Sequence, residues 1–353
     1  MEALGDPVDG ILLRETEALP PAPGAVVVLE DQSGALTAGV AALRPGVPVR
    51  ALVDSWTDQQ VVAAAVTGVP QVTLLDDLGP ELLGGAVLVV MRLPKGLAAL
   101  DAAAEAVARW ADPAVVLLAG GRVKHMSRGM NDVLARHFGA VRASLGAQKS
   151  RVLVAREPRP ATTSRYPLAG FDADLGLQVR AHGGAFAGPA VDLGTRSLIG
   201  FAGSFPADAR RVVDLGCGTG LLAVTAARTL PGATVLALDA SRAAVLSAAA
   251  TAEANGVADR VEVRRTHLAG GVPDGSVDLV LCNPPFHRGN SRDSAVAFEL
   301  LADAARVLRP GGELWTVYNS HLPYLRTLRR LVGSTAVVGQ NTGFTVTRSV
   351  RSA

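Results

Sequence analysis

The stretch from Cys282 to His287 brings together residue types that could do chemistry. An apolar run at residues 277–281 precedes it and predicts a buried strand, which would deliver Asn283 to the edge of a sheet. The two prolines that follow cannot continue a strand ladder, and their fixed φ angles hold the neighbouring carbonyl groups in set directions. An amide oxygen beside a main-chain carbonyl suits a planar NH₂ group, and an aromatic ring can stack on the ring that bears it. The residues expected to form this site for a nucleobase or a side-chain amide are Asn283, Pro284, Pro285 and Phe286.

A second candidate site lies upstream, where Gly216, Gly218 and Gly220 follow a predicted strand and open a predicted helix. Asp214 precedes this loop, at a position where a carboxylate can meet an ammonium group. Asp239 stands at the tip of the next predicted strand and can accept hydrogen bonds from both hydroxyls of a ribose. The sequence contains no Gly-x-x-x-x-Gly-Lys-Ser/Thr phosphate loop. An amino acid joined to a nucleoside is S-adenosylmethionine, so this pattern favours that methyl donor.

Two other interpretations of the glycine loop stay open. A dinucleotide prefers the pattern G-x-G-x-x-G, with its pyrophosphate on the helix N-terminus, and here the third glycine comes one residue too early. A glycine-rich turn with a purely structural role is the second alternative.

The composition is that of a globular chain. It has 353 residues, 49% hydrophobic and 19% charged, which is enough for two domains. No apolar run approaches the roughly 20 residues that span a membrane, and the first residues lack the features of a signal peptide, so we expect a cytoplasmic protein. The only cysteines, Cys217 and Cys282, form neither a disulfide framework nor a metal-ligand pattern, so we expect no structural metal.

Charge is distributed unevenly along the chain. Residues 1–155 carry 13 Lys and Arg against 16 Asp and Glu, a net charge of -3, whereas residues 156–353 carry 21 against 16, a net charge of +5. All 21 basic residues of the second half are arginine, which binds phosphate as a planar fork and stacks on bases. Either this half binds nucleic acid or the genome favours arginine codons.

Predicted strands alternate with Ala-rich helices in both halves of the chain, which is typical of parallel, doubly wound α/β sheets. Six strands are predicted in the first half. Seven are predicted in the second, and the closeness of the last two predicts a parallel sheet that ends in an antiparallel hairpin. The Pro-rich residues 156–167 are predicted to be a linker between domains at 1–155 and 168–353.

The two halves resemble two copies of one α/β domain. Asp214 and Asp239 lie 25 residues apart at successive strand ends, and Asp31 and Asp54 lie 23 residues apart in the first half. Residues 91–95 stand where the second half has its Asn-Pro-Pro stretch. The first copy lacks that stretch and two of the three glycines, which predicts a degenerate domain that does not bind the same ligand. Chance likeness between two α/β sheets is the alternative.

In these motifs the second half resembles class I methyltransferases that modify exocyclic or amide nitrogens. Over most of its length the chain is similar to the RsmC/RlmG family of ribosomal RNA guanine-N2-methyltransferases, in which a degenerate N-terminal methyltransferase-like domain precedes an active one. The segments that carry the resemblance are 184–194, 282–287, 311–314, 319–324 and 341–344 in the second half, and 92–95 and 148–151 in the first. The tail and the first-half segments look closer to the large-subunit enzyme than to the small-subunit enzyme.

The resemblance implies two tandem Rossmann-like domains, the second with a seven-stranded catalytic sheet. It implies S-adenosylmethionine as cofactor and methyl transfer to the N2 amine of a guanine in ribosomal RNA. Phe186 would cover the cofactor, although the Ser-Arg that usually follows it in the family is absent, and Thr266 stands where the family tends to carry asparagine near the adenine. The cofactor-binding residues expected are Asp214, Gly216, Gly218, Gly220, Asp239, Thr266 and Phe186.

Two other functions are compatible with these motifs. Adenine N6 and the glutamine amide of proteins also present a planar NH₂ group, so either could be the methylated nitrogen. A non-catalytic ribosome assembly factor that retains the donor pocket belongs to a different class. The expected partner is ribosomal RNA or a ribosomal subunit, with no membrane, no metal and a monomeric chain.

Overall fold

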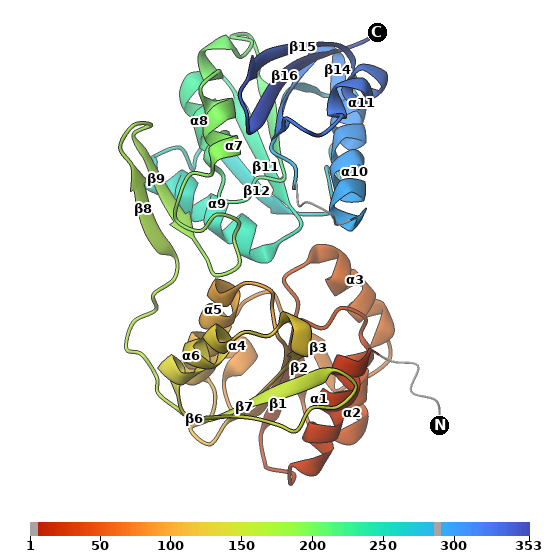
Figure 1. The fold of residues 1–353 in the computed structure, drawn as a ribbon, viewed down its shortest axis with the longest axis vertical. Coiled ribbons are helices and arrows are strands. Elements are labelled where there is room, and N and C mark those ends of the chain that lie inside the picture. Colours follow the sequence, from red (N-terminus) through yellow and green to blue (C-terminus); the bar gives the residue numbers. More distant parts are fainter. Residues whose placement is uncertain (1–5, 286–290) are drawn as a thin grey trace. The chain divides into compact units, whose positions relative to one another are not determined.

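The computed structural model describes residues 6–285 and 291–353, with only the backbone described for 291–294. It divides into two compact units, Met1–Tyr166 and Pro167–Ala353. Each unit is an α/β domain with its own seven-stranded sheet and helices on both faces (Figure 1). Within the described residues no helix is long and apolar enough to cross a bilayer, and no group of three His, Cys, Asp or Glu side chains could hold a metal ion.

The sheet of the first unit has the order β3-β2-β1-β4-β5-β7-β6. Its strands are β1 (Ala25–Leu29), β2 (Val49–Leu52), β3 (Val72–Leu74), β4 (Ala86–Arg92), β5 (Val116–Arg122), β6 (Phe138–Ala143) and β7 (Ser150–Pro158). Its helices are α1 (Pro7–Ala18), α2 (Ala35–Leu43), α3 (Trp56–Ala65), α4 (Pro80–Leu83), α5 (Leu97–Trp110) and α6 (Arg128–His137), with a short 3-10 turn at Val123–His125. Apolar side chains of α1 and α2 pack on one face of the sheet, and those of α4, α5 and α6 pack on the other.

The first sheet, which was predicted to be parallel, is mixed. Strands β1 to β5 are parallel, but β7 runs antiparallel to β5 and β6 runs antiparallel to β7. Strand β6 is the strand that the sequence did not predict. It starts directly after α6 at the sheet edge, and most of its residues are exposed or half-buried, so it has no continuous apolar run.

The sheet of the second unit has the order β12-β11-β10-β13-β14-β16-β15, which is the order of the first sheet repeated. The sheet strands are β10 (Arg211–Leu215), β11 (Thr234–Asp239), β12 (Val261–Arg265), β13 (Val277–Cys282), β14 (Leu308–Asn319), β15 (Gly333–Gln340) and β16 (Phe344–Arg351). The helices are α7 (Leu193–Ile199), α8 (Leu221–Thr229), α9 (Arg242–Ala254), α10 (Ser291–Val307) and α11 (Tyr324–Leu331), with a 3-10 turn at Ala202–Ser204. A separate hairpin of β8 (Leu168–Asp172) and β9 (Leu177–Ala181) precedes them.

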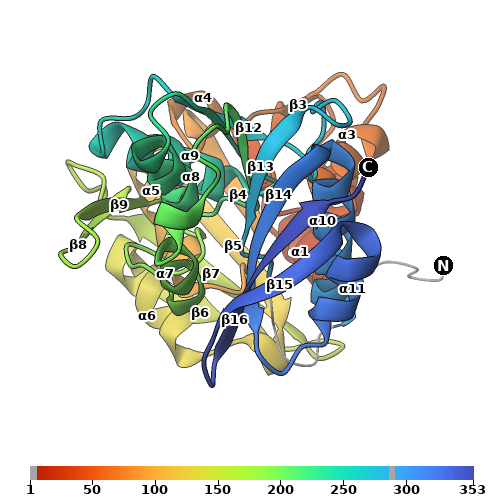
Figure 2. The same ribbon diagram turned by 90° about the horizontal axis from the view of Figure 1, so that it is seen from above.

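The predicted seven strands with a terminal antiparallel hairpin are confirmed for this second sheet, because β15 pairs antiparallel with β16. Strand β16 inserts between β14 and β15 and is also antiparallel to β14. Helices α7, α8 and α9 cover one face, where Trp315 of β14 is almost fully buried, and α10 and α11 cover the other (Figure 2). Buried apolar residues on both faces explain why the central strands read as continuous apolar runs.

The segment predicted as a linker is partly ordered against the first unit. Strand β7 continues to Pro158, three residues into that segment. Beyond it, Ser164 Oγ donates to Glu105 Oε1 of α5 at 2.6 Å, and the Tyr166 hydroxyl donates to Asp101 Oδ2 of the same helix at 3.0 Å. Both acceptors are buried, so the last residues before Pro167 are fixed to α5.

Strand registers and helix starts define which positions correspond in the two units. Val28 pairs with Ala51 across β1 and β2, and Asp214 pairs with Ala237 across β10 and β11. Six residues beyond Val28 and beyond Asp214, a glycine in the left-handed conformation precedes α2 or α8. Four residues beyond Ala51 and beyond Ala237, a serine caps α3 or α9. Val28 is therefore the residue that corresponds to Asp214. Asp31 and Asp54, which the sequence comparison matched with Asp214 and Asp239, are not the corresponding residues.

Candidate functional site

The predicted polar residues of the second unit gather at the carboxyl ends of four neighbouring parallel strands. Asp214 lies in β10, Asp239 ends β11, Thr266 follows β12 and Asn283 follows β13. These strands stand in the order β12-β11-β10-β13, so their ends form one edge of the sheet. Ligands of open α/β sheets bind at such an edge, which makes this group the candidate site.

Asp214 is a buried carboxylate, and only one of its two oxygens accepts a hydrogen bond among the described residues. Its Oδ2 accepts from the backbone N–H of Ala223 in α8 at 2.9 Å, whereas its buried Oδ1 has no hydrogen-bond partner among the described residues. Burial raises the pKa of Asp214 to about 7; the bond from Ala223 opposes this shift and the nearby charge of Asp239 adds to it. Buried polar atoms are nearly always paired, so the orphaned Oδ1 fits a cationic ligand group such as an ammonium.

The three glycines of the loop have different roles. Gly216 and Gly218 both have positive φ angles, and a Cβ atom at either position would meet nothing within 4 Å, so the backbone there borders open space. Gly220 also has a positive φ, but its Cβ would lie 2.8 Å from Cα of Ala248 in α9. The first two glycines therefore leave the backbone accessible, and the third lets α8 pack against α9.

Asp239 ties the glycine loop to the next strand. Its Oδ2 accepts from the backbone N–H of Gly218 at 3.0 Å, and its Oδ1 accepts from the backbone N–H of Ser241 at 2.9 Å. Each carboxylate oxygen can accept more than one hydrogen bond, so the pair can also receive two ribose hydroxyls. The backbone carbonyl of Asp239 accepts from the N–H of Thr266 at 2.9 Å, which holds Thr266 beside it.

The side chain of Asn283 is held by the N-terminus of α7. Its Nδ2 lies 3.2 Å from Oδ1 of Asp192, the N-cap residue of α7, and 3.0 Å from Oγ1 of Thr195. Both N–H hydrogens of the amide thus have acceptors within the protein. The amide oxygen of Asn283 is the acceptor that the side chain can offer to a substrate.

The first unit carries different side chains at the positions that correspond to the candidate site residues. Val28 replaces Asp214, Val53 replaces Asp239 and Arg92 replaces Asn283, as the strand registers show. In addition, Asp31 occupies the loop of the first unit. Its carboxylate is fully buried and accepts from the backbone N–H groups of Ser33, Gly34 and Thr37 and from the Thr37 hydroxyl.

The single glycine kept in the first unit has a packing role. A Cβ at Gly34, which corresponds to Gly220, would lie 2.2 Å from Cβ of Ala65 in α3. At the position of Gly216 the first unit has Glu30, which keeps a positive φ of 61°. The backbone of this loop therefore follows a similar course in both units, although the side chains differ.

Comparison with known proteins decides the family. The family described as "Methyltransferase small domain" matches residues 176–348, and the "RLMG N-terminal domain" family matches residues 6–159. The ribosomal RNA large subunit methyltransferase G of Streptomyces avermitilis is 36% identical over 98% of this chain and 92% of that protein. The protein of the same name from Streptomyces coelicolor is 38% identical over 94% of this chain and 89% of that protein. The chain belongs to the ribosomal RNA large subunit methyltransferase G family.

The membership confirms the resemblance that the sequence motifs indicated, and the large-subunit branch is the one that matches. The fold agrees with it. The 16S rRNA N2 methyltransferase RsmC of T. thermophilus, solved in complex with AdoMet and guanosine, has a TM-score of 0.78 at 22% identity and covers 99% of this chain and 93% of that one. The predicted architecture of two tandem Rossmann-like domains is thereby confirmed.

Not every predicted site residue of this methyltransferase G family member falls within the structure. Pro284 is buried and Pro285 is exposed at the end of β13, while Phe286 and His287 lie outside the described residues. Phe186 is 61% exposed in the loop before α7. The roles of these residues stay predictions.

Sequence reasoning assigned no role to Asp192 and Thr195, although both contact Asn283. An aspartate directly before a predicted helix is a typical N-cap, and that pattern was the available signal. It gave no indication that the same carboxylate also faces a residue 91 positions further along the chain.

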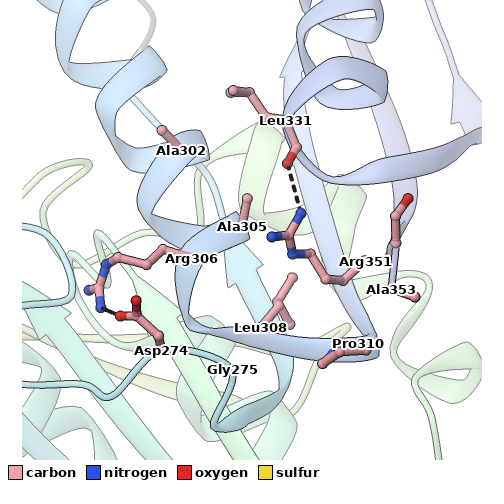
Figure 3. A pocket seen from close by; sticks show the side chains of 11 residues that line it. Asp274, Gly275, Ala302, Ala305, Arg306, Leu308, Pro310, Leu331, Arg351 and Ala353 are labelled. Atoms are coloured by element: carbon pink, nitrogen blue, oxygen red, sulfur yellow. Dashed lines mark hydrogen bonds and ion pairs between the residues drawn. The ribbon is translucent and has the colours of Figure 1, made fainter.

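Two other features of this methyltransferase unit do not belong to the site chemistry. Burial raises the pKa of the Cys217 and Cys282 thiols, which disfavours the thiolate form that a nucleophile needs. A cavity of about 560 Å³ lies at the amino ends of β13 and β14, away from Asp214. In Figure 3 its arginines are already engaged, Arg306 with Asp274 and Arg351 with the carbonyl of Leu331.

Proposed function

We propose that this protein transfers a methyl group from S-adenosylmethionine to the exocyclic N2 amine of a guanine in large-subunit ribosomal RNA. The observation that carries the proposal is the Asn283 side chain, whose amide nitrogen is bound within the protein while its oxygen remains to accept from an amine. It stands at the same strand edge as Asp214 and the open glycine loop. Membership of the methyltransferase G family supports the reaction and the large-subunit RNA as substrate.

The donor-binding residues are those of β10, β11 and β12. The orphaned Oδ1 of Asp214 accepts from the ammonium group of the donor, and the Asp239 carboxylate accepts from the ribose hydroxyls. Gly216 and Gly218 leave the backbone open to the ligand, Thr266 lies near the adenine, and Phe186 covers the cofactor. When bound, S-adenosylmethionine supplies an electrophilic methyl group on a sulfonium.

Asn283 and Pro284 act on the nucleophile. The lone pair of the guanine amine is delocalised into the ring, which makes the nitrogen a poor nucleophile. Accepting its two hydrogens on the Asn283 oxygen and the Pro284 carbonyl favours a pyramidal nitrogen, aims its lone pair and stabilises the positive charge that develops there. The proton becomes far more acidic once the nitrogen is alkylated and leaves to water, so no strong base is required.

The target guanine must reach this edge outside a base pair. Its N2 amine is covered in paired or stacked RNA, so the enzyme accepts a base that is unpaired or unstacked, with Phe286 as the stacking ring. The proposal includes action in the cytoplasm by a monomer on ribosomal RNA or a ribosomal subunit.

Methylation of in vitro transcribed ribosomal RNA with radiolabelled donor tests the proposal. Digestion and chromatography of the labelled RNA should give N2-methylguanosine, and Asn283→Ala should abolish transfer while the Kd for the donor stays within about threefold. Label in N6-methyladenosine, label in protein only, or an unchanged rate in Asn283→Ala would refute it.

A further inference from the structure

The carboxylate of Asp192 contacts both the backbone of α7 and the side chain of Asn283. Its Oδ1 accepts from the backbone N–H groups of Gly194 at 3.0 Å and Thr195 at 3.1 Å, which caps α7. The same oxygen lies 3.2 Å from Nδ2 of Asn283. The N-terminus of α7 and the end of β13 are therefore joined through one oxygen atom.

This contact determines which end of the Asn283 amide faces which way. An ionised carboxylate can only accept hydrogen bonds, so the atom of Asn283 that faces Asp192 must be the NH₂ group. The hydroxyl of Thr195, at 3.0 Å, can either donate or accept and would tolerate both orientations. Asp192 decides the orientation, and Thr195 takes up the second hydrogen.

We propose that Asp192 is a positioning residue for methyl transfer, which fixes the Asn283 amide with its oxygen toward the substrate amine, and that Thr195 assists it. With the amide reversed, Asn283 would present hydrogens to an NH₂ group that also carries hydrogens, and the two groups would repel. This inference rests on the proposed function, because it assumes that Asn283 accepts from the target amine.

The spacing around Gly194 agrees with this role. A Cβ at Gly194 would lie 3.3 Å from both Nδ2 and Oδ1 of Asn283 and 3.1 Å from Oδ1 of Asp192. The Asn283 amide thus lies against a residue without a side chain, which leaves it room between Asp192 and Thr195. An alanine at this position would have to displace it by a few tenths of an ångström.

The first unit repeats this arrangement with other side chains. Asp6 caps α1 as Asp192 caps α7, and Asp9 stands three residues later, as Thr195 does. Both acids bind Arg92, which occupies the position of Asn283: Arg92 lies 3.1 Å from Asp6 and makes a closer ion pair with Asp9. In both units the first helix is therefore bound through its N-terminal residues to the end of a central strand. In the first unit these residues bind the Arg92 guanidinium, and in the second they bind the Asn283 amide.

Two substitutions separate the positioning role from helix capping. Serine and asparagine are both good N-cap residues, so Asp192→Ser and Asp192→Asn should each keep α7 capped. Only asparagine is long enough to offer an acceptor to Asn283. We expect Asp192→Ser to lower kcat for ribosomal RNA by roughly tenfold to a hundredfold, with the donor Kd and the Tm close to those of the wild type. Asp192→Asn should keep kcat within about threefold.

The matched control is Asp6→Ser, which removes the corresponding contact in the first unit and should leave kcat unchanged. Equal kcat values in Asp192→Ser and Asp192→Asn would overturn the positioning role. If Asp192→Ser does not fold, Thr195→Val provides the second test, since it keeps the side-chain shape and removes one acceptor; an unchanged kcat there would count equally against the inference. If Asn283→Ala itself leaves kcat unchanged, the proposed function fails instead.

Discussion

Replacing Asp214 by asparagine should stabilise the ligand-free protein while weakening donor binding. The folded-state pKa of Asp214 is about 7 against 3.8 for the free side chain, so the unfolded chain loses its proton first as the pH rises. Stability therefore falls between about pH 4 and pH 7, by up to about 4 kcal/mol at 1.36 kcal/mol per pKa unit. Asparagine removes this titration, but its NH₂ group at the orphaned position costs about 2 kcal/mol. We expect a net gain of about 2 kcal/mol at pH 8.

Thermal unfolding with and without donor measures both effects. The Tm of ligand-free Asp214→Asn at pH 8 should exceed that of the wild type by roughly 5 °C, and the order should reverse near pH 4, where the folded wild-type carboxyl is protonated and only the cost of the asparagine NH₂ group remains. Binding the donor ammonium requires the ionised carboxylate, so wild-type donor affinity should fall about fivefold from pH 7 to pH 6, whereas the variant binds weakly at both. A variant that is less stable than the wild type at pH 8, or that binds donor equally well, would refute this reasoning.

Three further predictions follow from single contacts. Asp239→Asn should weaken donor binding by about tenfold in calorimetry, because one of its two oxygens becomes a donor group. Gly220→Ala should destabilise the protein by about 2 kcal/mol or more in urea unfolding, because it combines a positive φ with a 2.8 Å approach to Ala248. Arg92→Ala should cost about 3 kcal/mol of stability by leaving the buried Asp9 carboxylate without its ion-pair partner, and the donor Kd of the folded variant should not change.

Much of the fold could be predicted because the central strands are buried on both faces and read as uninterrupted apolar runs. The edge strand β6 could not, since its residues are mostly exposed and follow α6 without a turn. The sequence comparison also matched acids in the two units that do not occupy corresponding positions. Asp31 lies three residues beyond Val28, and Asp54 lies one beyond Val53, so only the helix starts and strand registers show which residues correspond.

The site residues that lie at the ends of parallel strands could be predicted from the sequence. Parallel strands bring their carboxyl ends to one edge, so Asp214, Asp239 and Asn283 were expected to lie together, and they do. The partners of Asn283 were missed because they depend on how α7 packs near the end of β13. The sequence records that Asp192 can cap a helix, but the contact with Asn283 exists only in the folded chain.

The buried carboxylate of Asp31 has a consequence for any attempt to engineer a donor site into the first unit. It occupies the backbone amides of the loop, so an acid introduced at Val28 alone would place a second carboxylate beside one that is already satisfied. A donor site would also require changes at Val53, which is buried, and at Arg92, which is paired with Asp9. Such a design therefore needs several coordinated substitutions and cannot be approached one residue at a time.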